Sequence, residues 1–348
     1  MMKTILKVIA WIIVLVIAGF VSFLAYQTAT EFKPPKEIAI SSSYAADTIG
    51  DTLTLISWNI GYCGLGSEMD FFYEGGKMVR PTEELYTQYS EDVMKRIHSF
   101  DTASFILLQE VDTLAKRSYR NNQLRQIKEH LSGMHGSMGL NYNAWVPIPP
   151  SEPMGKVRAG QVTFSRYKPV FAKRIAFESS YSWPIRLFQL KRCFIETRYL
   201  TSDGKQLVLV NTHNSAFDDA AELREKELKT LRQLMVDEYS KGNYVIIGGD
   251  WNQNPPTFDS TEVLPIYKPR VIRPGIPDDF IPEGWICAYD PEHTTNRYVN
   301  RNYVEGETYS TLIDFFVLSP NVKLEKVMTI PTGFREADHQ PVVLKVTI

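Results

Sequence analysis

Cysteine is scarce in this 348-residue chain and follows no pattern. The three cysteines, Cys63, Cys193 and Cys287, are far apart and form no CxxC pair or other metal-ligand spacing. This spacing argues against a thiolate zinc site and gives no support to a disulfide framework. One disulfide bond between two of the three cysteines is the alternative. We expect the thiols to be buried as small apolar side chains.

An excess of positive charge is also missing. Outside residues 1–36 the chain carries 34 basic and 39 acidic side chains, a net charge of −5. A protein that binds nucleic acid through its phosphates alone shows a basic patch, and no segment here gathers more than a few Lys or Arg. A polyanionic substrate would therefore need a metal ion to offset the repulsion.

One long apolar run stands near the N-terminus. Residues 8–26 contain no charged side chain and follow Lys3 and Lys7. The run is close to the ~20 residues that cross a bilayer as a helix. We therefore predict a transmembrane anchor over 8–26, with residues 1–7 in the cytoplasm by the positive-inside rule and the remainder outside it. A cleaved signal peptide is the alternative. Residues 27–50 have the composition of a tether.

Residues 51–348 alternate short apolar runs with amphipathic segments, which is the pattern of a single α/β domain. Helices are predicted over 83–99, around 124–131, and after Asp219, where Glu222 stands at the capping-box spacing. Strands are predicted over 53–60, 104–112, 159–170, 192–200, 206–213, 244–247, 310–320 and 340–348.

Polar side chains cluster at the ends of these predicted strands. Each has an ordinary explanation alone, such as a turn residue or a surface carboxylate. Strand ends in an α/β sheet meet at one edge, so together they predict a site. Acids and amides suit a hard cation, and imidazoles suit proton transfer and phosphate contact. The residues are Asn59, Glu110, His213, Asp250, Asn252, Asp314, Asp338 and His339.

The glycines at 248 and 249 precede Asp250 in the stretch IIGGDWNQNPP. Glycine lets a backbone approach another group closely. Asp250 and Asn252 are two residues apart, so in an extended chain their side chains point the same way, toward whatever group the glycines let approach. A simple Asx turn ahead of Pro255 is the alternative.

Seven stretches, in order, resemble the endonuclease/exonuclease/phosphatase superfamily. They are SWNI, LLQEVD, AGQVTFSR, NTHNS, GGDWNQNP, LIDFFVLSP and ADHQPVV, within residues 53–348. The resemblance implies a four-layer sandwich, in which two mixed β-sheets lie face to face between outer helices. It also implies a metal-dependent phosphoester hydrolase.

The resemblance assigns the metal ligands. Glu110 is similar to the family's principal Mg²⁺ ligand, and Asn59 beside it contacts metal or phosphate. Asp338 is a candidate further ligand. Mn²⁺ is the expected substitute for Mg²⁺.

The resemblance also assigns the reacting groups. Asp250 is similar to the residue that aligns and deprotonates the attacking water, and Asn252 orients the phosphate. The resemblance also implies that the two glycines before Asp250 admit this phosphate. His213 resembles a general acid or phosphate contact. His339 resembles the imidazole that binds the scissile phosphate, oriented by Asp314.

Two features depart from the family pattern. The family often has an arginine shortly before the position of Asp314, whereas the stretch STLID has none. The phosphate or structural contact made by that arginine therefore has no assigned residue here. Residues 61–81 form an unusually elaborate loop, which fits either a substrate-shaping lid or a packed surface loop. Residues 181–188 fit either an exposed aromatic wall or ordinary core.

These observations predict a membrane-anchored hydrolase that acts outside the cytoplasm on a small or lipid-linked phosphoester. One alternative is an extracytoplasmic endonuclease or exonuclease on DNA or RNA. Another is a non-catalytic binding module on the same fold, which should have lost some of the reacting residues. No protein partner can be inferred.

Overall fold

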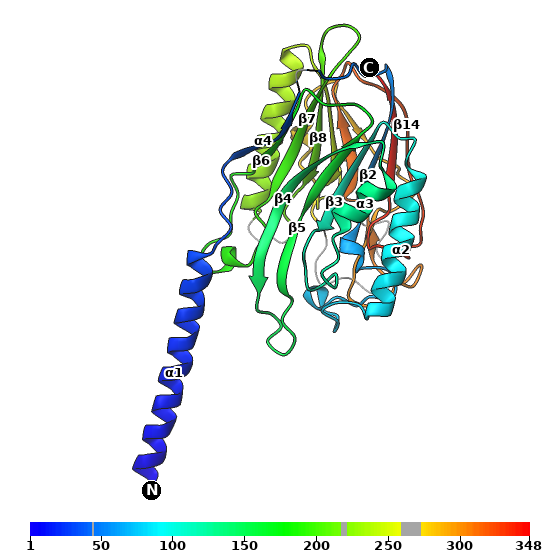
Figure 1. Ribbon diagram of the computed structural model, residues 1–348. Helices are drawn as coiled ribbons and strands as arrows, with labels where there is room; N and C mark the ends of the chain where they lie inside the picture. The colour runs from blue at the N-terminus through cyan, green and yellow to red at the C-terminus, as the bar shows by residue number, and fades with distance from the viewer. Residues whose placement is uncertain (44, 217–220, 259–272) are drawn as a thin grey trace.

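Two mixed β-sheets lie face to face in this computed structural model, with helices on both outer surfaces (Figure 1). The structure describes residues 1–43, 45–216, 221–258 and 273–348. The arrangement confirms the predicted four-layer α/β sandwich, preceded by an apolar helix. The predicted cap Asp219 lies outside the described residues.

The first sheet has six strands in the order β14-β15-β2-β3-β5-β4. Its only parallel pair, among the described residues, is β2 with β3, so Asn59 lies beside Gln109 where both strands end. Its strands are β2 (Thr52–Asn59), β3 (Phe105–Asp112), β4 (His135–Val146), β5 (Gly155–Ser165), β14 (Lys323–Thr329) and β15 (Val342–Thr347).

The second sheet has seven strands in the order β1-β6-β7-β8-β9-β13-β10. Here β8 and β9 are parallel, which places His213 opposite Asp250, and antiparallel β13 places Asp314 on the other side of Asp250. Its strands are β1 (Glu37–Ser42), β6 (Phe171–Ala176), β7 (Cys193–Leu200), β8 (Gln206–His213), β9 (Tyr244–Asp250), β10 (Ile286–Ala288) and β13 (Asp314–Leu318). A small ribbon pairs β11 (Asn296–Arg297) with β12 (Ser310–Thr311).

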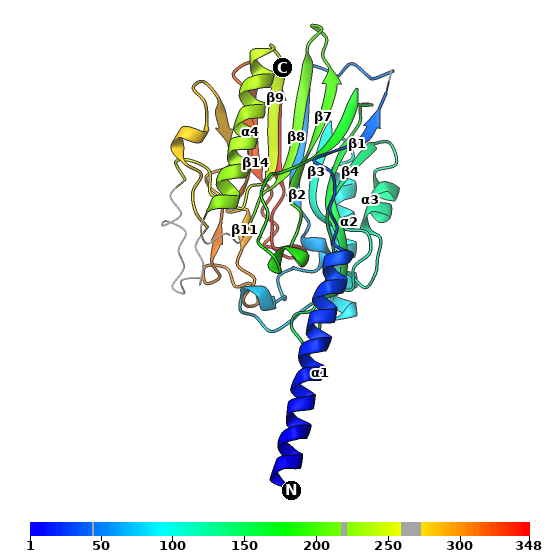
Figure 2. The same ribbon diagram turned by 90° about the vertical axis from the view of Figure 1, so that its left-hand side faces the viewer.

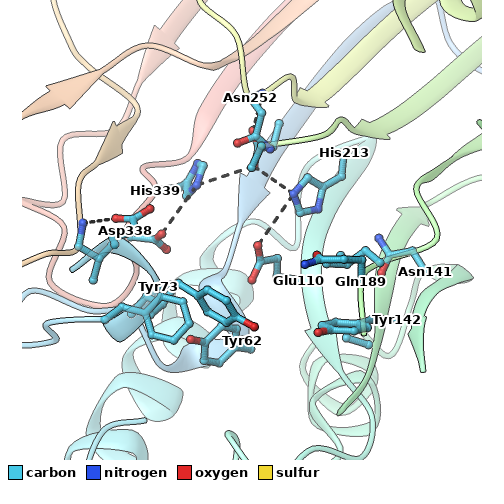
Figure 3. A pocket seen from close by; sticks show the side chains of 18 of the residues that line it. Tyr62, Tyr73, Glu110, Asn141, Tyr142, Gln189, His213, Asn252, Asp338 and His339 are labelled. Carbon is cyan, nitrogen blue, oxygen red and sulfur yellow. Dashed lines mark hydrogen bonds and ion pairs between the residues drawn. The ribbon is translucent and has the colours of Figure 1, made fainter. Parts of the chain in front are cut away.

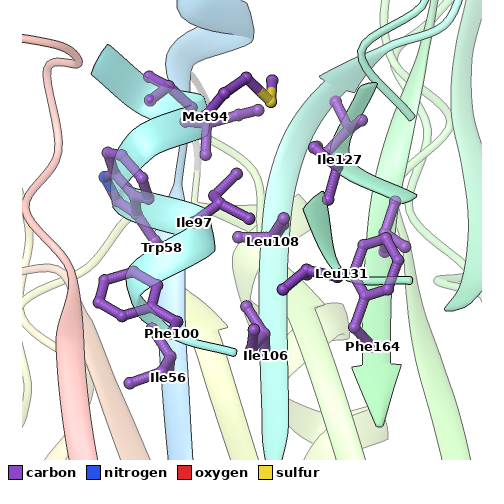
Figure 4. Close-up of a cluster of buried hydrophobic side chains, with 14 of the residues drawn as sticks. Ile56, Trp58, Met94, Ile97, Phe100, Ile106, Leu108, Ile127, Leu131 and Phe164 are labelled. Atoms are coloured by element: carbon purple, nitrogen blue, oxygen red, sulfur yellow. The ribbon is translucent and has the colours of Figure 1, made fainter. Parts of the chain in front are cut away.

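Alternating apolar side chains hold the layers together. On β2, Leu53 and Leu55 face the second sheet, whereas Ile56 and Trp58 face the outer helices. A strand that is buried on both faces needs apolar residues at every position, which explains the continuous runs in β2 and β3. Figure 4 shows the outer cluster between the sheet and α2 (Glu83–Ser99) and α3 (Gln123–His130). Helix α4 (Glu222–Ser240) covers the second sheet.

Helix α1 (Met2–Ala29) includes the predicted span 8–26. Among the described residues it is the one helix long and apolar enough to cross a membrane. It joins the domain at the end where β2, β3, β8 and β9 finish (Figure 2). The C-terminus lies at the opposite end, because Ile348 donates its N–H to the Asp51 carbonyl just before β2.

Parts of the segment 27–50, which was predicted as a tether, form regular secondary structure. Helix α1 continues to Ala29, and β1 pairs with β6 at the edge of the second sheet. An edge strand exposes one side to solvent, so its sequence has too few apolar residues to separate it from a linker.

Candidate active site

The structure brings all eight predicted site residues together at the edge where the parallel strands end. Asn59 makes one of the links between the sheets, because its Nδ2 donates to Asp250 Oδ2 at 3.0 Å. The same nitrogen lies 3.4 Å from Glu110 Oε1 and 3.5 Å from His339 Nε2. Because Asn59 is 1 % exposed, this amide lies in the interior of the site.

Glu110 enters the site through an irregularity in β3. The pairing of β3 with β5 shifts register between Leu108 and Val111, and Glu110 has the left-handed φ of 55°. Such a conformation is costly for a residue with a side chain and is typical of functional positions. It turns a carboxylate that is 24 % exposed toward the cavity, with Oε1 3.9 Å from His213 Nε2.

Asp250 is held as a carboxylate by its neighbours. Burial would raise its pKa, but His339 and His213, together with the Asn59 amide, hold the pKa below its usual value. Its Oδ2 lies 3.4 Å from His213 Nε2, and its Oδ1 accepts the Asn252 N–H at 2.9 Å. Asn252 itself has a φ of 53°. An ionised, oriented carboxylate of this kind can accept a proton from water.

The glycines before Asp250 have a different role from the expected one. A Cβ at Gly249, whose φ is 145°, would lie 2.0 Å from the Thr212 carbonyl oxygen, and one at Gly248 would meet the Phe316 ring. Close packing against neighbouring side chains and strands therefore requires both glycines. The expectation that they admit a phosphate is wrong because protein atoms fill the space.

His339 and Asp314 form a buried pair. Nδ1 of His339 lies 2.7 Å from Asp314 Oδ2, and its Nε2 lies 3.0 Å from Asn296 Nδ2. Burial lowers the pKa of His339, but Asp314, Asp250 and Asp338 outweigh it and raise the pKa to about 10. Below that pH the imidazole carries a positive charge and can bind an anion.

Asp314→Ala is expected to lower both stability and activity. Removing the carboxylate leaves the His339 charge buried without its nearest partner, which typically costs about 3–5 kcal/mol of unfolding free energy. Urea unfolding and kcat at a permissive temperature measure the two effects. Asp237→Ala on the exposed face of α4 is the control, and an Asp314→Ala variant as stable as this control would contradict the pairing.

Acidic groups at the same edge fit a cation. Burial, with Glu110 and Glu74 nearby, raises the pKa of Asp338 to about 7 despite the opposing effect of His339. Asp338 Oδ1 is buried and has no hydrogen-bond partner among the described residues. An unpartnered buried oxygen together with the partly exposed Glu110 carboxylate is the donor chemistry that Mg²⁺ prefers.

A second group of candidate metal ligands overlaps this one. Ligand atoms of Asp250, Asp314 and His339 lie within 4.8 Å of one another. This group could hold an ion, but the Asp314–His339 hydrogen bond already occupies one oxygen and one nitrogen. The Glu110 and Asp338 oxygens are the better candidates because they lack such a bond to each other.

An aromatic pocket adjoins these groups. It has a volume of about 150 Å³ and is lined by Glu110, His213 and His339 on one side and by Tyr62, Tyr73 and Tyr142 on the other (Figure 3). The loop over 61–81 combines the two predicted alternatives. Tyr62 is 1 % exposed, so the loop is packed, and it also lines the pocket, so it forms a fixed wall.

Arg297 holds that wall in place. This fully buried guanidinium donates to the carbonyl oxygens of Leu65, Gly66 and Met69 at 3.2, 2.6 and 3.2 Å. It lies on β11, next to Asn296, which contacts His339. The wall and the His339 imidazole are therefore positioned by neighbouring residues of one short strand.

Two arginines of the pocket escaped the sequence analysis. Arg192, just before β7, and Arg273 both line the cavity. Arg192 Nη1 is buried and has no hydrogen-bond partner among the described residues, and Arg273 Nη2 lies 3.9 Å from Glu74 Oε1. These two arginines bring positive charge to the pocket, where the arginine that the family often has before the position of Asp314 is missing. No local sequence signal marks them, because loops bring them in.

Comparison with solved structures finds the same fold in several other proteins. An endonuclease/exonuclease/phosphatase from Beutenbergia cavernae is 16% identical, covering 86% of this chain and 72% of that one, with a TM-score of 0.57. D. rerio TDP2 complexed with single strand DNA product is 15% identical, covering 86% and 100%, with a TM-score of 0.54. The human Nocturnin catalytic domain with bound sulfate is 16% identical, covering 87% and 97%, with a TM-score of 0.51. A comparison with curated proteins found no match.

The fold and the cluster of carboxylates, amides and imidazoles define a hydrolase of ester bonds that depends on a divalent metal. The model of the Endonuclease/Exonuclease/phosphatase family matches residues 56–333. The chain belongs to this family.

Proposed function

We propose that the chain is a membrane-anchored, Mg²⁺-dependent hydrolase of a small or lipid-linked phosphoester, acting outside the cytoplasm. The observation that carries the proposal is the convergence of an ionised Asp250, a charged His339 and the carboxyl groups of Glu110 and Asp338 on one pocket. The proposed domain limits are 1–7 for the cytoplasmic end, 8–26 for the anchor and 51–348 for the catalytic domain.

Glu110 and Asp338 would hold the metal, with Asn59 beside them. A bound Mg²⁺ or Mn²⁺ would neutralise charge on the phosphoryl oxygens and so help them bear the charge of the transition state. The orphaned Asp338 oxygen and its raised pKa support this assignment, because both are relieved by a cation.

The other side chains have separable roles. Asp250 is suited to accept the proton of the attacking water, and Asn252 to orient the phosphate. His339 is positively charged at neutral pH and suited to bind the scissile phosphate. Burial and the nearby Arg192 charge hold the pKa of His213 well below its ordinary value. A neutral His213 favours hydrogen bonding to phosphate or water over the general-acid role.

Arg192→Gln is expected to raise KM about tenfold or more and to change kcat less. Arg192 lines the pocket, and its Nη1 has no hydrogen-bond partner in the described part of the chain, so we expect it to contact substrate oxygens before and during the reaction. When a substitution weakens the binding of the substrate and of the transition state equally, the effect appears mainly in KM. Arg125→Gln on exposed α3 is the matched control. An unchanged KM would show that Arg192 does not contact the substrate.

The pocket favours a compact substrate. Its volume of about 150 Å³ and its aromatic walls suit one phosphate group with a few neighbouring atoms. Hydrolysis of nucleic acid is the second candidate function, because the similar structure of D. rerio TDP2 contains a single strand DNA product. Such a substrate would have to thread between Tyr62 and His339.

A substrate panel tests the proposal. Purified full-length protein in detergent is assayed with phospholipids, sugar phosphates, plasmid DNA and single-stranded DNA at physiological salt. We expect kcat/KM to be largest for one of the first two classes. A preference for DNA above about tenfold, or ~1.4 kcal/mol in transition-state binding, would favour the nuclease. Activity on none of them would favour a binding module.

The orientation of the anchor follows from Lys3 and Lys7, which precede the apolar span. Protease added to intact spheroplasts should digest the catalytic domain, and alkaline carbonate should not extract the protein. Complete protection from protease would reverse the orientation.

A further inference from the structure

Exposed apolar side chains gather at the end of the domain where α1 joins. This set, the interfacial face, includes the two exposed tryptophans of the described domain, Trp145 at 40% and Trp183 at 51%. The tip of the β4–β5 hairpin and the loop that contains Tyr73 point in the direction in which α1 runs (Figure 1). The interfacial face comprises Tyr73, Leu114, Trp145, Ile148, Trp183 and Ile185.

The last turns of α1 are packed on this face. The Phe23 ring lies 5.8 Å from the Trp145 ring and 6.0 Å from the Phe188 ring, and Trp183 Nε1 donates to Thr28 Oγ1 at 3.2 Å. Just beyond the helix, Glu31 Oε1 accepts from Lys191 Nζ at 2.7 Å. The domain is thus held in a defined orientation relative to the helix.

These contacts set the depth of the face in a bilayer. Phe23 belongs to the span 8–26 and stands three residues, about 4.5 Å of helix, before its end at Tyr26. Side chains that touch Phe23 therefore lie at the level where a spanning helix leaves the hydrocarbon. Tryptophan is enriched at that level because its ring is apolar and its N–H is polar.

The mouth of the pocket is continuous with the face. Tyr73 belongs to both, being 37% exposed and lining the cavity. Phe188, which stacks on Phe23, is followed by Gln189 and Leu190, which also line the cavity. Phe188 also accepts a hydrogen bond from the pocket residue Tyr142, at 2.8 Å from its hydroxyl. Phe188 therefore connects the end of α1 directly to the wall of the pocket.

We propose that the interfacial face rests on the bilayer and that the pocket takes its phosphoester from a membrane lipid, whose headgroup enters from the membrane side. The inference rests on the proposed function, because it requires that α1 spans a bilayer and that the pocket hydrolyses phosphoesters. It goes further by naming the surface that docks and the direction from which substrate arrives.

Spin labels test the docking without measuring activity. Ile148→Cys and Ile185→Cys variants of the full chain are labelled in proteoliposomes, with Leu200→Cys as the matched control. Leu200 is 37% exposed at the opposite end of the domain. We expect the first two labels to be accessible to oxygen and shielded from a water-soluble nickel complex, and the control label to be the reverse. Three equally water-accessible labels would overturn the proposal. Cys63 and Cys193 are buried, and the unmutated chain gives the labelling background.

A kinetic comparison tests the source of the substrate. An Ile148→Glu and Ile185→Glu double variant should hydrolyse phosphatidylcholine, phosphatidylethanolamine or phosphatidylglycerol vesicles at least tenfold more slowly. Its rate on soluble bis(4-nitrophenyl) phosphate should stay unchanged, and Leu200→Glu should alter neither rate. Equal loss on both substrates, or hydrolysis of the soluble ester alone by the unmutated chain, would overturn the lipid source. Shielded labels in a chain that hydrolyses no ester would instead contradict the proposed function and leave the docking intact.

Discussion

Asp250→Asn should lower kcat by about 10²–10⁴-fold and leave the fold intact. The amide has the size of the carboxylate and can still accept the 3.0 Å hydrogen bond from Asn59. It cannot take a proton from water, which is the role proposed for Asp250. The loss should therefore appear in kcat on every ester the enzyme hydrolyses.

The measurement compares kcat and the unfolding temperature of Asp250→Asn with those of Asp237→Asn. Asp237 is exposed on α4 and does not line the pocket, so it should tolerate the change. A kcat within threefold of the unmutated value would show that another group activates the water. A large fall in unfolding temperature would indicate a structural role in addition.

Removal of divalent metal should reduce hydrolysis to near background, and Mg²⁺ or Mn²⁺ should restore it. Glu110→Gln should reproduce most of the loss at saturating Mg²⁺, at least about 10²-fold in kcat/KM. The reason is local charge: Glu110 is the ionisable side chain that turns toward the cavity through the irregularity in β3. A glutamine keeps the shape and removes the charge.

The control for Glu110→Gln is Glu91→Gln, at an exposed position on α2. Calorimetric titration with Mg²⁺ separates weakened metal binding from other causes, since the control should bind as the unmutated protein does. Full activity in excess chelator, with the absence of metal confirmed by elemental analysis, would exclude the proposed metal requirement.

The sequence predicted the central strands well because they are buried on both faces. The continuous runs of β2, β3 and β8 have boundaries within about two residues of the predicted ones. The sequence did not predict strands β1, β4, β6, β10, β11 and β14. β4 contains Gly136 and Gly139 and lies at a sheet edge, where pairing with β5 rather than local propensity makes it a strand. The predicted strand over 310–320 is divided into β12 and β13, with Asp314 at the start of β13.

The candidate site was predictable where it depends on strand ends. Parallel pairing brings His213 to Asp250 directly, and the pattern of apolar runs reveals both strands. Arg192, Arg273 and Asn296 could not be found in this way. Arg192 and Arg273 reach the pocket, and Asn296 reaches His339, through segments whose path depends on contacts between distant parts of the chain, such as the isolated bridge between Asn296 and His339.

The wall over 61–81 lies in the connection between two strands whose relative position is set elsewhere. Parallel pairing of β2 with β3 fixes Asn59 beside Gln109 whatever the length of the chain between them. Relatives could therefore lengthen, shorten or exchange this segment during evolution without disturbing the reacting groups. Because Arg297 donates to three of its carbonyl groups, a grafted segment would need a matching residue on β11. A protein engineer who wishes to change which ester is accepted should exchange the two together.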